Sequence, residues 1–179
     1  MLRLLLVTVA ACVIQTTLVR YIRIAGIAPD LLVTFLVAIS TYGGPYTGFC
    51  AGSLMAMLYD ASVGYVLAIN LVGYTFIGWA ATLLREAIRR PLRKLRHKSY
   101  LEMMAACFVL TAAKEAVNVG YLFLIGADQN YVALIRLLAC AAYSAVMIIP
   151  VAFLLRRFMG WHPIRMKKKQ EEDVTEPHR

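Results

Sequence analysis

The residues that could do chemistry in this sequence are five ionisable side chains that lie within or beside long apolar segments. They are Asp30, Asp60, Lys114, Glu115 and Arg136. A charged side chain near the centre of a membrane helix costs roughly 2.5–3.5 kcal/mol on insertion scales, so each one requires a charged partner or a polar cavity. The set therefore predicts either a buried polar network that fixes the register of helices or a binding site for a ligand or ion.

The positions of these residues suggest which of them meet. Lys114 and Glu115 are sequence neighbours whose side chains diverge by about 100° around a helix, so we expect each to contact another helix rather than its neighbour. Arg136 can approach Glu115 if the last two apolar segments form an antiparallel hairpin. Three amides also fall in apolar segments, where they usually form interhelical hydrogen bonds; they are Gln15, Asn70 and Asn118.

The sequence lacks the patterns that are typical of enzymes and metal sites. Its three histidines are scattered, and no nucleophile stands at a catalytic spacing from a base. The cysteines have no metal-ligand spacing, and we expect all of them to be buried free thiols. We therefore expect no catalysis, no cofactor and no metal. The cysteines are Cys12, Cys50, Cys107 and Cys140.

The composition is that of an integral membrane protein. Hydrophobic residues make up 61% of the 179 residues, charged residues only 16%, and the mean hydropathy is +0.68. Soluble domains contain about half apolar and about a quarter charged residues. The net charge of +9 comes from basic residues clustered between the apolar segments and near the C-terminus, so we assign it to loops and expect no nucleic-acid partner.

Six apolar segments are candidates for membrane spans. They lie at about residues 4–18, 31–42, 45–59, 65–84, 101–125 and 131–155. A spanning helix needs about 20 residues, so the second and third are short, and a re-entrant pair that never crosses is the alternative for them. The expected organisation is an all-α six-helix membrane domain over residues 1–159 and a basic-then-acidic cytoplasmic tail over residues 160–179.

The distribution of basic residues predicts the orientation. Residues 85–98 carry seven Lys or Arg, and residues 156–169 carry six more. Short loops rich in Lys and Arg stay in the cytoplasm, so we expect both termini to be cytoplasmic. Four residues of the first cluster, Arg89, Arg90, Arg93 and Lys94, are candidates for contact with anionic lipid or a cytoplasmic partner; alternatively, the cluster serves only to orient the chain.

The stretch 27–60 contains a hinge and a row of small residues. Gly43, Gly44 and Pro45 separate the second segment from the third, and Pro45 suits the first turn of a new helix. Small residues then recur every four positions and form a flat strip that another helix can approach closely. We predict that a partner helix docks on this strip, although such rows also occur in ordinary membrane-helix packing. The strip consists of Gly44, Gly48, Gly52 and Ala56.

The order of several short motifs resembles one known family. The motifs are Gln15-Thr16-Thr17-Leu18, Pro29-Asp30-Leu31-Leu32, Gly44-Pro45 followed by Gly48, Gly52 and Asp60, and Gly73-Tyr74. Over residues 12–80 the chain is similar to the bacterial rod shape-determining protein MreD family. The segment after Asp60 departs from the family's glycine-containing continuation, and Asn70 takes that place. Nothing in the last two segments matches, so Lys114, Glu115 and Arg136 inherit no role.

The resemblance implies a non-enzymatic scaffold of the cell-elongation machinery in the bacterial plasma membrane. Members bind the bitopic protein MreC and help to couple MreB filaments to the peptidoglycan polymerase RodA and its penicillin-binding partner; a homodimer is also compatible with the sequence. The six-helix layout is also similar to the substrate-binding subunits of energy-coupling-factor vitamin transporters. That alternative predicts a cavity with unsatisfied polar groups, whereas a scaffold predicts that protein side chains fill the same region. An enzyme acting on lipid-linked precursors would have only Asp30 and Asp60 as candidate catalytic residues.

Overall fold

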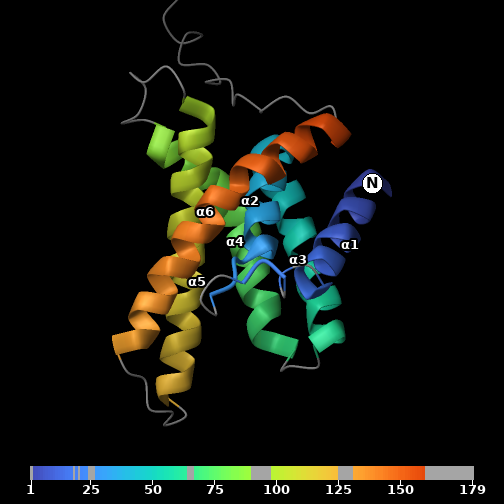
Figure 1. Ribbon diagram of the computed structural model, residues 1–179. Coiled ribbons are helices and arrows are strands. Elements are labelled where there is room, and N and C mark those ends of the chain that lie inside the picture. Colours follow the sequence, from blue (N-terminus) through green and yellow to red (C-terminus); the bar gives the residue numbers. More distant parts are fainter. Residues whose placement is uncertain are drawn as a thin grey trace, which may run out of the picture.

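The fold was obtained as a computed structural model, which describes residues 2–17, 19, 21–23, 27–63, 67–89, 98–124 and 131–159. This part of the chain forms six helices (Figure 1). Each coincides to within a few residues with one of the predicted apolar segments. The helices are α1 (Leu2–Thr17), α2 (Leu31–Gly43), α3 (Pro45–Val63), α4 (Leu67–Arg89), α5 (Lys98–Leu124) and α6 (Tyr131–Met159).

Helix α2 is the centre of the bundle. Every residue from Leu31 to Tyr42 is buried, and α2 contacts each of the other described helices (Figure 1). Its sequence is compatible with this position, because a helix that is apolar on nearly all sides is found either in a protein core or in a membrane. With 13 residues it is about 20 Å long, much shorter than α4, α5 and α6. It therefore begins inside the bundle rather than at one end (Figure 1).

The predicted hinge forms between α2 and α3. Gly44 has φ 86°, a left-handed conformation that glycine adopts without strain. The Gly44 N–H donates to the Ser40 carbonyl at 2.9 Å, which satisfies one carbonyl at the end of α2. Helix α3 then begins at Pro45, whose missing N–H is not needed in a first turn. The chain thus reverses direction within one residue, and α2 and α3 lie side by side.

Small residues bring α3 and α4 close together. A Cβ built on Gly48 would lie 2.2 Å from the Gly78 carbonyl oxygen, and one built on Gly52 would lie 2.4 Å from the Tyr74 carbonyl oxygen. The two backbones therefore approach as closely as glycine allows. On the other side of the bundle α5 and α6 form an antiparallel hairpin (Figure 1).

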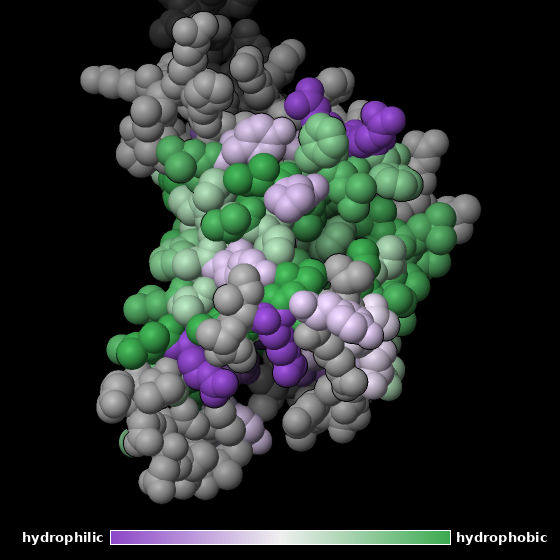
Figure 2. Space-filling view, in the orientation of Figure 1, coloured by the Kyte–Doolittle hydropathy of each residue, from purple (hydrophilic) through white to green (hydrophobic). Residues whose placement is uncertain are grey.

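The surface of the bundle is largely apolar. Figure 2 shows hydrophobic side chains over most of the middle of one face, with hydrophilic residues above and below. In the described part of the chain, two helices are long and apolar enough to cross a membrane, over Tyr100–Tyr121 and Ala133–Phe158. The apolar helices Leu4–Thr17 and Leu31–Gly43 are shorter. The all-helical fold is thus confirmed, while a crossing by all six helices stays a prediction.

Candidate functional site

Three of the five predicted ionisable residues meet where α2 begins. Lys114 on α5 places its Nζ 2.6 Å from Asp30 Oδ2 and 3.2 Å from Glu115 Oε1. The side chain of Asp30 is 5% exposed, that of Lys114 17% and that of Glu115 26%. The ammonium group also lies 5.3 Å from the ring centroid of Tyr74, within cation–π range. A charged network therefore forms at the core of the bundle, with Lys114 between two carboxylates.

Two details of the expected pairing were wrong. Lys114 and Glu115 do contact each other, because the long, flexible lysine side chain can fold toward its neighbour although the two Cβ directions diverge. Arg136 is exposed on α6 and forms no ion pair with the described carboxylates. The next residue, Leu137, is buried, and the Arg136 side chain leaves α6 about 100° away from it, on an exposed face.

Asp30 is also the N-cap of α2. Its Oδ1 accepts from the Val33 N–H at 3.1 Å while Oδ2 binds Lys114. The first N–H groups of a helix lack partners within the helix, and a buried end must find them elsewhere. Asp30 thus neutralises the lysine and completes the helix start with the same carboxylate.

Side chains from α1 and α6 satisfy the remaining backbone groups at this buried helix start. Gln15 Oε1 accepts from the Leu31 N–H at 2.9 Å, and Ser144 Oγ accepts from the Asp30 N–H at 2.8 Å. The Thr34 hydroxyl donates back to the Asp30 carbonyl at 2.8 Å. We call these residues, with Lys114 and Glu115, the α2-start cluster: Gln15, Asp30, Thr34, Lys114, Glu115 and Ser144. Its polar groups bind one another and join four helices.

Asp60 lies outside that cluster and has a different partner. Its Oδ1 accepts from Asn70 Nδ2 at 2.8 Å, which links α3 to α4. The residue is 2% exposed, and its Oδ2 has no hydrogen-bond partner among the described residues. The expected interhelical role of the amides is therefore confirmed for Asn70 and for Gln15, whereas Asp60 does not join the lysine network.

The predicted docking strip is occupied by the protein itself. Gly44, Gly48, Gly52 and Ala56 are all buried, and Gly48 and Gly52 face the backbone of α4. The small residues do allow a close helix approach, but the approaching helix is α4 of the same chain. The expectation that a partner helix docks here is therefore wrong, because no room for it remains.

A second buried ion pair lies between α4 and α5 and was not predicted. Arg85 Nε and Glu102 Oε2 are 3.5 Å apart, and their side chains are 10% and 3% exposed. Arg85 was assigned to the basic loop, but α4 continues to Arg89 and holds it inside the bundle. The signal in the sequence is Glu102, an acidic residue at the start of an apolar helix that needs a cation nearby.

Some predicted residues receive no structural account. Arg90, Arg93, Lys94 and the tail over residues 160–179 lie outside the described residues. Arg89 is the last residue of α4, and its side chain is likewise outside the description. Lipid or partner contact by this group therefore stays a prediction.

The cysteines follow the expectation with one exception. All four are free; Cys12 and Cys107 are buried and Cys140 is half-buried, but Cys50 is exposed on α3. Cys50 is exposed because it lies on the face of α3 opposite the strip of small residues, and the strip is the face that packs against α4. No group of His, Cys, Asp or Glu in the described part of the chain could hold a metal ion.

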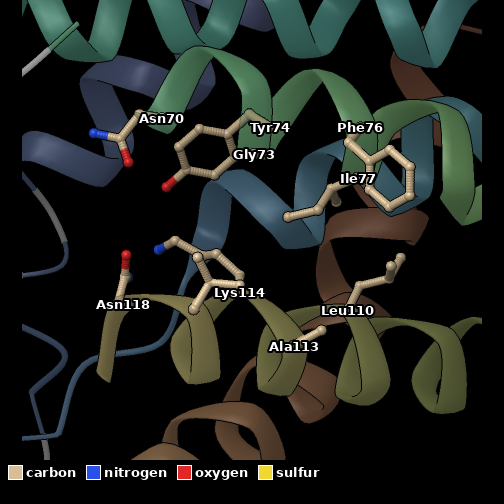
Figure 3. A pocket seen from close by; sticks show the side chains of 10 residues that line it. Asn70, Gly73, Tyr74, Phe76, Ile77, Leu110, Ala113, Lys114 and Asn118 are labelled. Atoms are coloured by element: carbon tan, nitrogen blue, oxygen red, sulfur yellow. The ribbon is translucent and has the colours of Figure 1, made fainter. Parts of the chain in front are cut away.

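A cleft opens between α4 and α5 beside the α2-start cluster. Its volume is about 180 Å³, below the 300–1,000 Å³ of typical ligand pockets. Figure 3 shows the polar ends of Asn70, Tyr74, Lys114 and Asn118 together at one end of the cleft. Apolar side chains line the other end; they are Phe76, Ile77, Leu110 and Ala113. The cleft is therefore small and amphipathic.

Comparison with known proteins identifies no relative. No protein-family model, no curated protein and no solved structure matches the chain.

Proposed function

We propose that the protein is a non-catalytic membrane scaffold subunit of the bacterial cell-elongation complex, similar to the MreD family. In this proposal all six helices lie in the plasma membrane with both termini in the cytoplasm. The start of α1 and the ends of α4 and α6 lie on one side of the bundle (Figure 1), as this topology requires. The short helix α2 needs no lipid contact of its own, because the other helices cover it.

The observation that carries the scaffold proposal is the pairing of Asp30 and Lys114 within the α2-start cluster. Both carboxylate oxygens of Asp30 have donors, and Lys114 binds two carboxylates. A binding site for a polar substrate would keep such groups unpaired and facing a cavity. Charged groups that already cap a helix and pair with another side chain support a structural role, which is what a scaffold requires.

The residues that carry the family resemblance support the same conclusion. Gln15 and Asp30 complete the start of α2, Gly48 and Gly52 allow α4 to approach, and Asp60 links α3 to α4 through its amide partner. Each of these motif residues joins two parts of the bundle, and none forms a nucleophile–base or metal-binding arrangement. The motif residues therefore support a role in holding the bundle together. The resemblance to the MreD family links this bundle to the elongation machinery.

The proposed partners are an MreC-like single-span protein and, directly or through it, the peptidoglycan polymerase complex and MreB. Because the strip around Gly48 is filled by α4, a partner helix must bind elsewhere on the apolar surface. Exposed hydrophobic side chains are available on α1, α5 and α6, for example Leu6, Phe123 and Phe153. Helices associate in lipid through close van der Waals packing rather than through hydrophobic burial, because lipid tails are as apolar as leucine.

One observation favours the transporter alternative. Asn118 faces the α4–α5 cleft (Figure 3) and has no hydrogen-bond partner among the described residues. A vitamin-binding subunit would need several such groups and a cavity larger than about 180 Å³. The small volume is the reason that we place this function second.

The experiment is the recovery of partners with the tagged protein from its own host in a mild detergent. The proposal predicts a single-span protein and proteins of peptidoglycan synthesis. Recovery of coupling ATPases, or of a tightly held water-soluble small molecule and no protein partner, would assign the chain to transport instead.

A further inference from the structure

The α4–α5 cleft has unused hydrogen-bonding groups at its polar end. Asn118 has no hydrogen-bond partner among the described residues. Asn70 donates its Nδ2 to Asp60, and no described residue donates to its carbonyl oxygen. Polar groups that lie among apolar helices are costly when they stay unpaired. A molecule in the cleft would therefore be held by one amide on each side, with donors and acceptors of its own.

The charge around the polar end limits what this molecule can be. Lys114 is the formal cation that lines the cleft, and it is already paired with Asp30 and Glu115. A third carboxylate, Asp60, accepts a hydrogen bond from Asn70. Three formal negative charges against one positive charge disfavour an added anion such as a free phosphate. A net-neutral group that donates hydrogen bonds suits this surrounding better.

The rest of the cleft is apolar and open to the side. Its other end is lined by Ile77, Leu110 and Ala113, and by Phe76, which is 60% exposed at the surface of α4. A cavity of about 150 Å³ holds one benzene ring, so about 180 Å³ has room for a polar linkage and a few methylene groups. A longer chain would continue through the side opening along the exposed helix faces.

We propose that the α4–α5 cleft binds one membrane lipid with a net-neutral, hydrogen-donating headgroup. The headgroup and ester region pair with Asn70 and Asn118, and the first part of one acyl chain lies along Ile77 and Leu110. The inference rests on the membrane placement proposed above, but it does not depend on the identity of the protein partners.

Two glycines provide a matched pair of variants. A Cβ at Gly73, which lines the cleft, meets no atom within 4 Å, and the same is true of Gly120, which does not line it. Gly73→Leu should therefore fill the cleft without displacing the described chain. Gly120→Leu adds the same side chain outside the cleft. Asn118→Leu removes a hydrogen-bonding group and is expected to reduce binding about fivefold, the usual effect of one hydrogen bond.

The test is photocrosslinking in lipid nanodiscs that contain phosphatidylethanolamine or phosphatidylglycerol with a diazirine in one acyl chain, followed by peptide mapping. We expect phosphatidylethanolamine to label residues 70–77 and 110–118 more strongly than phosphatidylglycerol does. Gly73→Leu should abolish this labelling, and Gly120→Leu should leave it unchanged. Equal labelling of both glycine variants would overturn the inference, as would a preference for the anionic lipid. Loss of a protein partner in Gly73→Leu with unchanged labelling would assign the cleft to a partner helix instead.

Extraction of host membranes with alkaline carbonate tests the membrane placement separately from the lipid site. Release of the protein into the soluble fraction would contradict the membrane placement, and the lipid site would fail with it. If the protein stays in the membrane but Gly73→Leu is labelled as strongly as the unmodified protein, the lipid site alone would be overturned.

Discussion

Adding one methyl group at Gly48 should separate α3 from α4. The new Cβ would lie 2.2 Å from the Gly78 carbonyl oxygen and 2.6 Å from Ser40 Oγ, whereas ordinary contacts begin at 3.4 Å. The helices must therefore move apart by about an ångström, since neither backbone can turn aside. This movement also disturbs the hydrogen bond from the Ser40 hydroxyl to the Gly78 carbonyl, now 2.7 Å long.

The magnitude follows from these contacts. Overpacking of a tight site costs about 1–3 kcal/mol, and a lost hydrogen bond adds about 1 kcal/mol. Alanine is a better helix former than glycine by about 1 kcal/mol, which offsets part of the loss. We expect Gly48→Ala to lower the free energy of unfolding by about 1–3 kcal/mol.

Gly73→Ala is the control on the neighbouring helix. Nothing lies within 4 Å of a Cβ at that position, so this variant keeps the gain in helix propensity without the clash. The assay is unfolding by sodium dodecyl sulfate in mixed micelles, followed by circular dichroism. Equal stabilities of Gly48→Ala and Gly73→Ala would refute the close approach of α3 and α4.

Three further variants test other contacts by the same unfolding assay. Lys114→Met should lower the free energy of unfolding by about 3–5 kcal/mol, because the Asp30 carboxylate stays buried without its cation; a loss below 1 kcal/mol would contradict the pairing. Gln15→Leu should cost about 1–3 kcal/mol by removing the acceptor of the Leu31 N–H, and faster hydrogen exchange at that amide would accompany it; unchanged exchange would contradict the contact. Gly44→Ala should cost about 1–3 kcal/mol, because φ 86° with ψ 174° is a backbone conformation that essentially only glycine adopts, and unchanged stability would contradict the geometry of the hinge.

The helices could be predicted from the sequence because apolar length and the Gly-Gly-Pro hinge mark their ends directly. Each predicted segment coincides with one helix. The depth of α2 could not be predicted in this way. Hydropathy places the first residue of an apolar segment near a membrane surface, but Asp30 begins a short helix inside the bundle and so reaches Lys114.

The partners of small and charged residues were harder to predict than their roles. The row through Gly48 indicates a close helix approach, but periodicity does not identify the approaching helix, which the structure shows to be α4. Arg136 and Glu115 have opposite charges on adjacent helices, yet Arg136 is exposed and forms no ion pair with a described carboxylate. Which face of a helix turns inward depends on all of its neighbours, and a single sequence does not give that arrangement.

The proposed role of the α2-start cluster can be tested by removing all of its charges together. Asp30→Asn, Lys114→Met and Glu115→Gln form a neutral triple variant, in which asparagine remains a good N-cap for α2. Removing a whole buried ion network is often tolerated, whereas removing one member leaves a charge unpaired. Lys114→Met alone is therefore the matched destabilised control.

The most direct measurement is the recovery of the proposed partners, a single-span protein and the peptidoglycan polymerase, with this triple variant, compared with the unmodified protein. A structural cluster predicts equal recovery with the triple variant and reduced recovery with Lys114→Met. If the triple variant inserts and folds normally but recovers neither partner, the charges themselves take part in binding, and the account of a scaffold held together by an internally paired polar cluster is wrong.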